Sequence, residues 1–140
     1  MLRFTLPDER KLVHEMTIPI RWGDMDAMGH VNNTVYFRYF EIVRLAWFET
    51  LDCAPNPVGE GPVIVNAFCN FIRQLEYPGE VLAKHCVAHV GRSSFDTYLT
   101  LERADRPGVV CTEGGARTVW VDFPKQKSCA LPERLRQLLS

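Results

Sequence analysis

The sequence has no long apolar run, almost no net charge and no leader-like start. Its 140 residues carry a formal net charge of −1, so no general electrostatic attraction to nucleic acid or to an anionic membrane is expected. It contains no run of about 18 apolar residues, the length that a membrane-spanning helix needs. Residues 1–11 include Asp8 and Glu9 and lack the apolar core of a signal peptide. We therefore predict a cytoplasmic protein that binds neither nucleic acid nor membrane.

Cysteine is present but is not arranged in a pairing or redox motif. A secreted protein would show paired spacings, whereas here the cysteines are odd in number, scattered and without C-x-x-C. No histidine stands in an activating motif beside one of them, which disfavours a catalytic cysteine. Free thiols in a reducing compartment are predicted. The five residues are Cys53, Cys69, Cys86, Cys111 and Cys129.

The composition and the order of patterns predict a single α+β domain over residues 1–140. The chain is 46% hydrophobic and 24% charged, as is typical of a globular domain that can bury a core. Residues 34–50 are predicted to form one long, mostly apolar helix, with Asn33 as its N-cap. Strands are predicted at 15–22, 62–73, 80–91, 95–103 and 109–123, and a short terminal helix at 131–139.

Short turns between the last four strands predict an antiparallel sheet of five strands, wrapped round the long helix. Pro19 cannot donate to a ladder, so the first strand is expected at an edge. The Gly114-Gly115 pair predicts a bulge or a bend in the last strand. Trp22, Trp47 and Trp120 are expected in the core. A structural role is expected for Asn66 and Asn70. The same is expected for the histidines other than His30, which are His14, His85 and His89.

The segment most suited to chemistry precedes the long helix and contains Asp24 and Asp26. Unpaired amides and the helix dipole favour negative charge at a helix start. Acyl hydrolysis needs a carboxylate that attacks or activates water, together with backbone donors for the oxyanion. A simpler interpretation is that both aspartates only shape an Asx-rich turn. The residues alone leave both interpretations open.

A metal site made by Asp24, Asp26 and His30 is a third interpretation. The loop does not match an EF-hand, because Met28 stands at its fifth position and Val35 at its twelfth, where glutamate is required. The sequence also lacks the H-E-x-x-H zinc motif. We therefore predict no metal.

The run from Gly23 to Asn33, which reads G-D-M-D-A-M-G-H-V-N-N, strongly resembles the loop of hotdog-fold thioesterases of the 4-hydroxybenzoyl-CoA thioesterase-like group. The order of elements is similar from about residue 14 to residue 123. The resemblance implies a hotdog fold and an acyl-CoA thioesterase that releases free acid and CoA. It implies no cofactor, since CoA is part of the substrate.

The resemblance also implies roles for individual residues. Asp26 corresponds to the nucleophile or general base, and Asn33 offers its backbone amide to the thioester oxygen. His30 either positions Asp26 or is structural, and we include it among the catalytic candidates. Tyr36 is a candidate for substrate binding or for packing beside the substrate.

The loop between the third and fourth strands is where this group contacts CoA. It is Gly91-Arg92-Ser93-Ser94 here, in which Arg92 suits phosphate and both Ser93 and Ser94 suit hydrogen bonding. Relatives with three successive basic residues differ, because only Arg92 is basic in this loop. The resemblance also implies a homodimer or homotetramer with active sites between subunits. A hotdog hydratase or dehydratase and a non-catalytic acyl-CoA or acyl-carrier binding protein are the alternatives.

Overall fold

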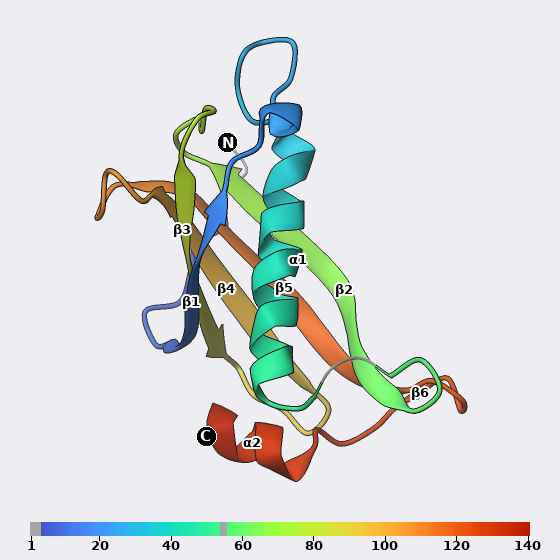
Figure 1. Cartoon of the computed structure of the whole chain (residues 1–140). Helices are drawn as coiled ribbons and strands as arrows, with labels where there is room; N and C mark the ends of the chain where they lie inside the picture. The colour runs from blue at the N-terminus through green and yellow to red at the C-terminus, as the bar shows by residue number, and fades with distance from the viewer. Residues whose placement is uncertain (1–3, 54–55) are drawn as a thin grey trace.

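A computed structural model describes residues 4–53 and 56–140 of the chain. The chain folds as an antiparallel sheet with one long helix across its concave face (Figure 1). The elements are β1 (Lys11–Pro19), a 3-10 turn η1 (Trp22–Asp24), α1 (Asn33–Thr50), β2 (Glu60–Phe71), β3 (Glu80–Ala88), β4 (Ser94–Arg103), β5 (Val110–Asp122), β6 (Lys127–Ser128) and α2 (Glu133–Leu139).

The sheet has six strands rather than the predicted five. The strand order is β1-β3-β4-β5-β2, and the additional strand, β6, pairs with the end of β5. Because β6 has only two residues, Lys127 and Ser128, it is too short to produce an alternating sequence pattern. Every pairing is antiparallel. Strand β1 lies at an edge, which confirms the prediction made from Pro19.

The start of α1 differs from the prediction by one residue. The N-cap is Asn32 and not Asn33, because the Asn32 Oδ1 accepts the Thr34 amide at 2.9 Å. The Asn32 amide is itself bound to the Asp24 carbonyl oxygen at 2.9 Å. A contact with the preceding loop therefore selects between two adjacent asparagines that cap equally well by sequence.

The buried face of α1 divides the core into two clusters along the helix. The cluster near the start of α1 includes Tyr36, Tyr39 and Phe40 with residues of β1, β3 and β4. The cluster near its end includes Trp47 and Phe48, and α2 closes it with Leu135 and Leu139. The two ends of α1 therefore lie in different surroundings, as Figure 1 shows. Within the described residues no helix is both long and apolar enough to cross a membrane.

Trp22 is not a core residue, which corrects the prediction for this position. Trp47 and Trp120 are buried, but Trp22 is 77% exposed. The alternation that buries Ile18 continues to Ile20 just after β1, but the chain then enters a 3-10 turn at Trp22, which no longer has the two-residue period of a strand. Trp22 is thereby left free to line a surface site.

Gly114 does not mark a bulge, because β5 stays in register there with both neighbouring strands. The register of β2 with β5 shifts instead between Ile64 and Asn66. At Gly114 the ring of Phe40 occupies the space where a Cβ would lie, and the Phe68 carbonyl oxygen is 3.0 Å from the same point. Close approach between helix and sheet explains this glycine.

We expect Gly114→Ala to lower the free energy of unfolding by about 1–3 kcal/mol, the usual penalty for overpacking a filled core. Urea denaturation measures the loss. Gly23→Ala is the matched control, because a Cβ at Gly23 meets no atom within 4 Å. Equal stability of the two variants would contradict the proposed packing of Phe40 against β5.

Candidate active site

Asp26 lies at the tip of a loop whose backbone is closed by hydrogen bonds. Met25 and Val31 form an antiparallel bridge, and the Asp26 amide donates to the His30 carbonyl oxygen at 2.8 Å. The Asp26 Oδ1 accepts the Met28 amide at 2.9 Å and the His30 amide at 3.4 Å. Among the described residues, Oδ2 has no hydrogen-bond partner. One oxygen therefore shapes the turn, and the other remains available to a ligand.

Asp24 differs from Asp26 in its surroundings. Its Oδ2 accepts two hydrogen bonds, from the Arg21 amide at 2.9 Å and from the Tyr39 hydroxyl at 2.8 Å. Asp24 does not line the cavity beside the loop, whereas Asp26 does. The turn-forming interpretation from sequence thus describes Asp24 fully and Asp26 only in part.

The cavity beside Asp26 has a volume of about 490 Å³. This is within the range of small-molecule sites. Its walls combine the free carboxylate with apolar and aromatic side chains. The lining residues are Trp22, Gly23, Met25, Asp26, Ala27, Gly29 and Tyr77. Such a surface can hold an apolar group while a carboxylate faces it.

The other predicted catalytic residues lie at the same end of α1 but outside this lining. The Asn33 amide has no acceptor among the described residues, so it remains a donor at the helix start. His30 is half-buried, with its Nε2 at 3.6 Å from the Glu76 Oε1. The Tyr36 hydroxyl accepts the Leu75 amide at 3.1 Å. Burial is the main cause that raises the pKa of Tyr36, and the charge of Asp26 adds to it.

Tyr36 is buried within the chain, at 2% exposure. Its ring packs edge-on against Phe71 with centroids 5.0 Å apart. A hydroxyl that already binds a backbone amide and a ring enclosed by neighbours fit the packing role better than direct contact with a substrate. Tyr36 thus supports the site from beneath.

The predicted CoA-binding loop lies at the opposite end of α1 from Asp26. The Arg92 carbonyl oxygen accepts the Leu131 amide at 2.9 Å, and Leu131 belongs to the cluster at the end of the helix. The 18 residues of α1 span about 27 Å at 1.5 Å per residue. Within one chain, the loop 91–94 and Asp26 are therefore not brought together.

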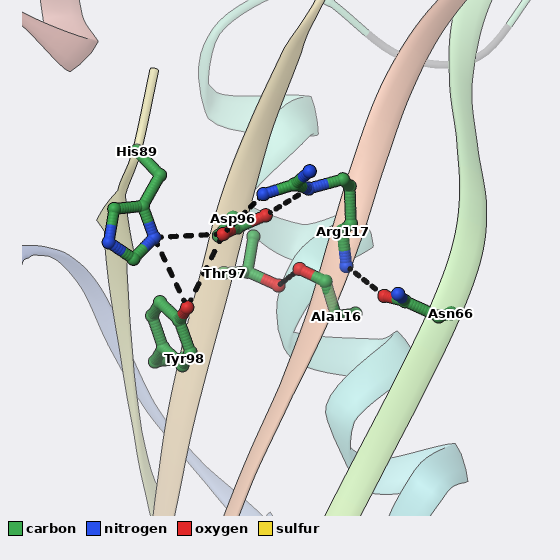
Figure 2. A network of polar contacts seen from close by, with 7 residues as sticks. All are labelled: Asn66, His89, Asp96, Thr97, Tyr98, Ala116 and Arg117. Carbon is green, nitrogen blue, oxygen red and sulfur yellow. Dashed lines mark hydrogen bonds and ion pairs between the residues drawn. The ribbon is translucent and has the colours of Figure 1, made fainter. Parts of the chain in front are cut away.

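A polar network that sequence reasoning did not predict lies on the face of the sheet opposite α1 (Figure 2). Asp96 is at its centre and binds the Arg117 Nε at 2.7 Å, the Arg117 Nη2 at 3.1 Å and the His89 Nδ1 at 2.9 Å. The Tyr98 hydroxyl is 3.3 Å from the same carboxylate. Burial alone would raise the pKa of Asp96, but the hydrogen bonds from Arg117 and His89 outweigh it and lower the pKa.

This network connects three strands and the loop that follows β3. Asn66 of β2 extends it, because its Oδ1 accepts the Arg117 amide at 3.1 Å beside the register shift. Alternation could place Asp96 and Tyr98 on one strand face, but no sequence signal shows that Arg117 lies opposite them. A cavity of about 390 Å³ adjoins the network. Since both Asp96 oxygens are bound, this carboxylate is poorly placed as a base.

The other polar residues considered from the sequence lie in the sheet. Asn70 donates to the Phe4 carbonyl oxygen, whereas Asn66 lines the 390 Å³ cavity beside the network. The structural role of the two asparagines stays a prediction. His85 lies in β3 and is fully buried. In the part of the chain that the structure describes, no three metal-ligating side chains gather at one point.

Known structures share this architecture and give it a class. The PA2801 protein of Pseudomonas aeruginosa, described as "a putative Thioesterase", is 35% identical, with a TM-score of 0.90 over 93% of this chain and 100% of that one. A Xanthomonas campestris protein described as "a putative acyl-CoA thioesterase" is 30% identical, with a TM-score of 0.72 over 79% of this chain and 93% of that one. The fold is the hotdog fold of these proteins.

The sequence defines the family. A sequence model of the thioesterase-like superfamily matches residues 20–139, so the chain belongs to this superfamily. The YsmA protein of Bacillus subtilis (strain 168) is 25% identical over 122 residues, which cover 87% of this chain and 82% of that protein. The region matched by the superfamily model, residues 20–139, contains the Asp26 loop, α1 and all strands after β1.

Proposed function

We propose that the protein hydrolyses an acyl-CoA thioester to a free acid and CoA, with Asp26 as the catalytic carboxylate. Two observations carry this proposal: the Asp26 Oδ2 has no hydrogen-bond partner among the described residues, and Asp26 lines a 490 Å³ cavity at the start of α1. Asp26 attacks the thioester carbonyl carbon directly or removes a proton from an attacking water. In both cases the carbon–sulfur bond then breaks, and the electron pair leaves with the CoA sulfur. After direct attack, a water hydrolyses the resulting acyl–Asp26 anhydride, which releases the free acid and restores the carboxylate.

The start of α1 supplies the stabilising charge for this reaction. The Asn33 amide and the helix dipole favour the oxyanion that forms on the carbonyl oxygen. A thiolate is a good leaving group, so a strong general acid is not required. The reaction needs no cofactor or metal. Membership of the thioesterase-like superfamily and the acyl-CoA description of the Xanthomonas campestris relative support the CoA ester as substrate.

A panel of CoA esters tests the activity directly. Short-chain, long-chain and aromatic acyl-CoAs are incubated with the protein, and the released thiol is measured. We expect turnover of at least one class, and acyl-carrier-protein esters of the same acids show which carrier is preferred. Tight binding of the esters without thiol release would instead favour a binding protein. Hydration of an enoyl-CoA would favour a hydratase, for which the His89–Asp96 pair is the corresponding histidine and carboxylate.

We further propose that the active unit is a dimer formed through the edge of β2. Among the strands of residues 4–53 and 56–140, none neighbours the outer side of β2, and an exposed edge strand favours pairing with another chain. Large apolar side chains are exposed on this side of the molecule, and Leu45 of α1 and Ile64 of β2 share a small hollow there. The exposed set is Phe37, Leu45, Ile64, Val65, Phe71 and Ile72.

A dimer of this kind also brings the loop 91–94 of one copy toward the Asp26 of the other. Antiparallel pairing of two β2 edges about a twofold axis makes the two α1 helices antiparallel. The loop with Arg92, near the C-terminal end of α1 in one copy, then lies at the same end of the assembly as Asp26 in the other. Arg92, Ser93 and Ser94 would thus bind CoA phosphates across the interface.

We expect Val65→Asp to convert the dimer to a monomer and to remove most hydrolysis. Val65 is 54% exposed on the edge strand, where a buried and unpaired charge opposes pairing. Light scattering at micromolar concentration gives the mass, and thiol release gives the activity. Val58→Asp is the control, since Val58 is 82% exposed but precedes β2. A wild-type monomer, or a Val65→Asp chain that stays dimeric, would contradict the interface.

A further inference from the structure

A hydrogen bond from the buried face of α1 holds the loop that carries Asp26. The Tyr39 hydroxyl donates to the Asp24 Oδ2 at 2.8 Å, and Tyr39 is only 2% exposed. Burial and the contact with Asp24 both raise the pKa of Tyr39, so the hydroxyl stays protonated and remains a donor. The contact joins the core of the helix to a residue two positions before Asp26.

Asp24 passes this constraint to both ends of the loop. Its Oδ2 also accepts the Arg21 amide at 2.9 Å, which fixes the entry to the loop. Its carbonyl oxygen accepts the Asn32 amide at 2.9 Å, which fixes the exit and the N-cap of α1. Asp24 therefore contacts both the segment that leads to Asp26 and the segment that leads to the Asn33 amide.

We infer that Asp24 is a positioning residue, which acts through the Tyr39 hydroxyl to hold Asp26 and the Asn33 amide in register for attack on the thioester. This inference rests on the proposed function and adds the residue pair that maintains its geometry. Small displacements of a reacting group cost much of the rate while binding is largely retained. The pair should thus affect kcat more than KM.

The role of Asp24 as a positioning group differs from a catalytic role in one measurable way. Positioning needs a hydrogen-bond acceptor at Oδ2 but not a negative charge. An asparagine can present its amide oxygen to Tyr39, whereas an alanine cannot. Asp24→Asn should therefore keep most activity, and Asp24→Ala should lose it. At Asp26 the chemistry needs the carboxylate itself, so Asp26→Asn should be inactive.

The experiment measures kcat and KM for Tyr39→Phe, Asp24→Ala and Asp24→Asn with the CoA ester that the panel shows to be turned over fastest. We expect Tyr39→Phe and Asp24→Ala to lower kcat by about tenfold or more, as for loss of one hydrogen bond to a charged group, with KM within about twofold. Combining Tyr39→Phe with Asp24→Ala should cost no more than the larger single loss, because both remove the same contact.

Amide hydrogen exchange gives a second measurement that requires no substrate. The Met28 and His30 amides are bound to the Asp26 Oδ1, and we expect Tyr39→Phe to make their exchange about tenfold faster through local opening. Thr97→Val is the control for general loss of a buried hydroxyl, because Thr97 donates to the Ala116 carbonyl oxygen at 3.4 Å, far along the sheet. It should leave both exchange at these amides and kcat unchanged.

The possible results separate this inference from the proposed function. If Asp24→Asn is as inactive as Asp26→Asn, then Asp24 takes part in the chemistry and the positioning role is wrong. Wild-type kcat and unchanged loop exchange in Tyr39→Phe would also overturn it. If instead Asp26→Asn turns over at the wild-type rate, the proposed function fails, whatever the exchange of the loop amides shows.

Discussion

Replacing Asp26 by asparagine is expected to lower kcat by about 10²–10⁴-fold, the usual scale for loss of a catalytic acid–base group. An asparagine oxygen can still accept the Met28 and His30 amides that now bind Oδ1. The loop therefore keeps its hydrogen bonds, while an amide nitrogen replaces the carboxylate oxygen that has no partner among the described residues. The measurement is thiol release from the preferred CoA ester, with thermal unfolding to show that the fold is intact.

Asp122→Asn is the matched control for this variant. The Asp122 Oδ1 also accepts a backbone amide in a turn, that of Lys125 at 3.1 Å, but it lies at the end of β5, away from the cavity. We expect its activity to equal that of the wild type. Near-full turnover by Asp26→Asn would show that the assignment of the catalytic carboxylate is wrong.

Acid is expected to destabilise the protein through His85, beginning as the pH falls below about 6.5. His85 is fully buried, at 0% exposure, and its ring packs against the Trp47 ring at a centroid distance of 5.0 Å. In the described part of the chain, neither ring nitrogen has a hydrogen-bond partner. Burial, followed by the charges of Arg44 and His14, lowers the pKa of His85 from 6.5 to about 3.

The direction of the pH effect follows from which form the folded state accepts. Above pH 6.5 the histidine is neutral in both folded and unfolded chains, so its contribution to stability is fully present. As the pH falls from 6.5 toward 3, His85 is protonated in the unfolded chain but stays neutral in the folded chain. The free energy of unfolding therefore decreases. At pH 4.5 the loss is about 2–3 kcal/mol, because each pKa unit corresponds to about 1.4 kcal/mol.

Urea unfolding at pH 7.0 and pH 4.5 checks this expectation, with His85→Leu as the reference. The variant has no group to protonate at this position, so it should lose about 2–3 kcal/mol less than the wild type between the two pH values. Asp96, whose pKa is lowered by its hydrogen bonds, contributes its stabilisation fully throughout this range and loses it only at lower pH. Equal losses in both proteins would show that His85 does not control the acid sensitivity.

Local patterns were sufficient to predict most of the fold. The long apolar helix and the antiparallel strands were found because the two periods of 3.6 and 2 residues are properties of consecutive side chains. The errors occurred where the pattern is too short or changes period. Strand β6 has two residues, and Trp22 follows the point at which strand alternation ends.

By itself, the sequence determined the loop chemistry: two aspartates, a histidine and two asparagines before an apolar helix. The resemblance pointed to Asp26, but only the tertiary structure gave the physical difference between the two aspartates. The Tyr39 hydroxyl lies 15 positions from Asp24 in the chain, yet it binds the Asp24 carboxylate and not that of Asp26. The tertiary structure also showed that Arg92 lies near the opposite end of α1 from Asp26. Such contacts depend on how elements pack, which the spacing of residues along the chain does not encode.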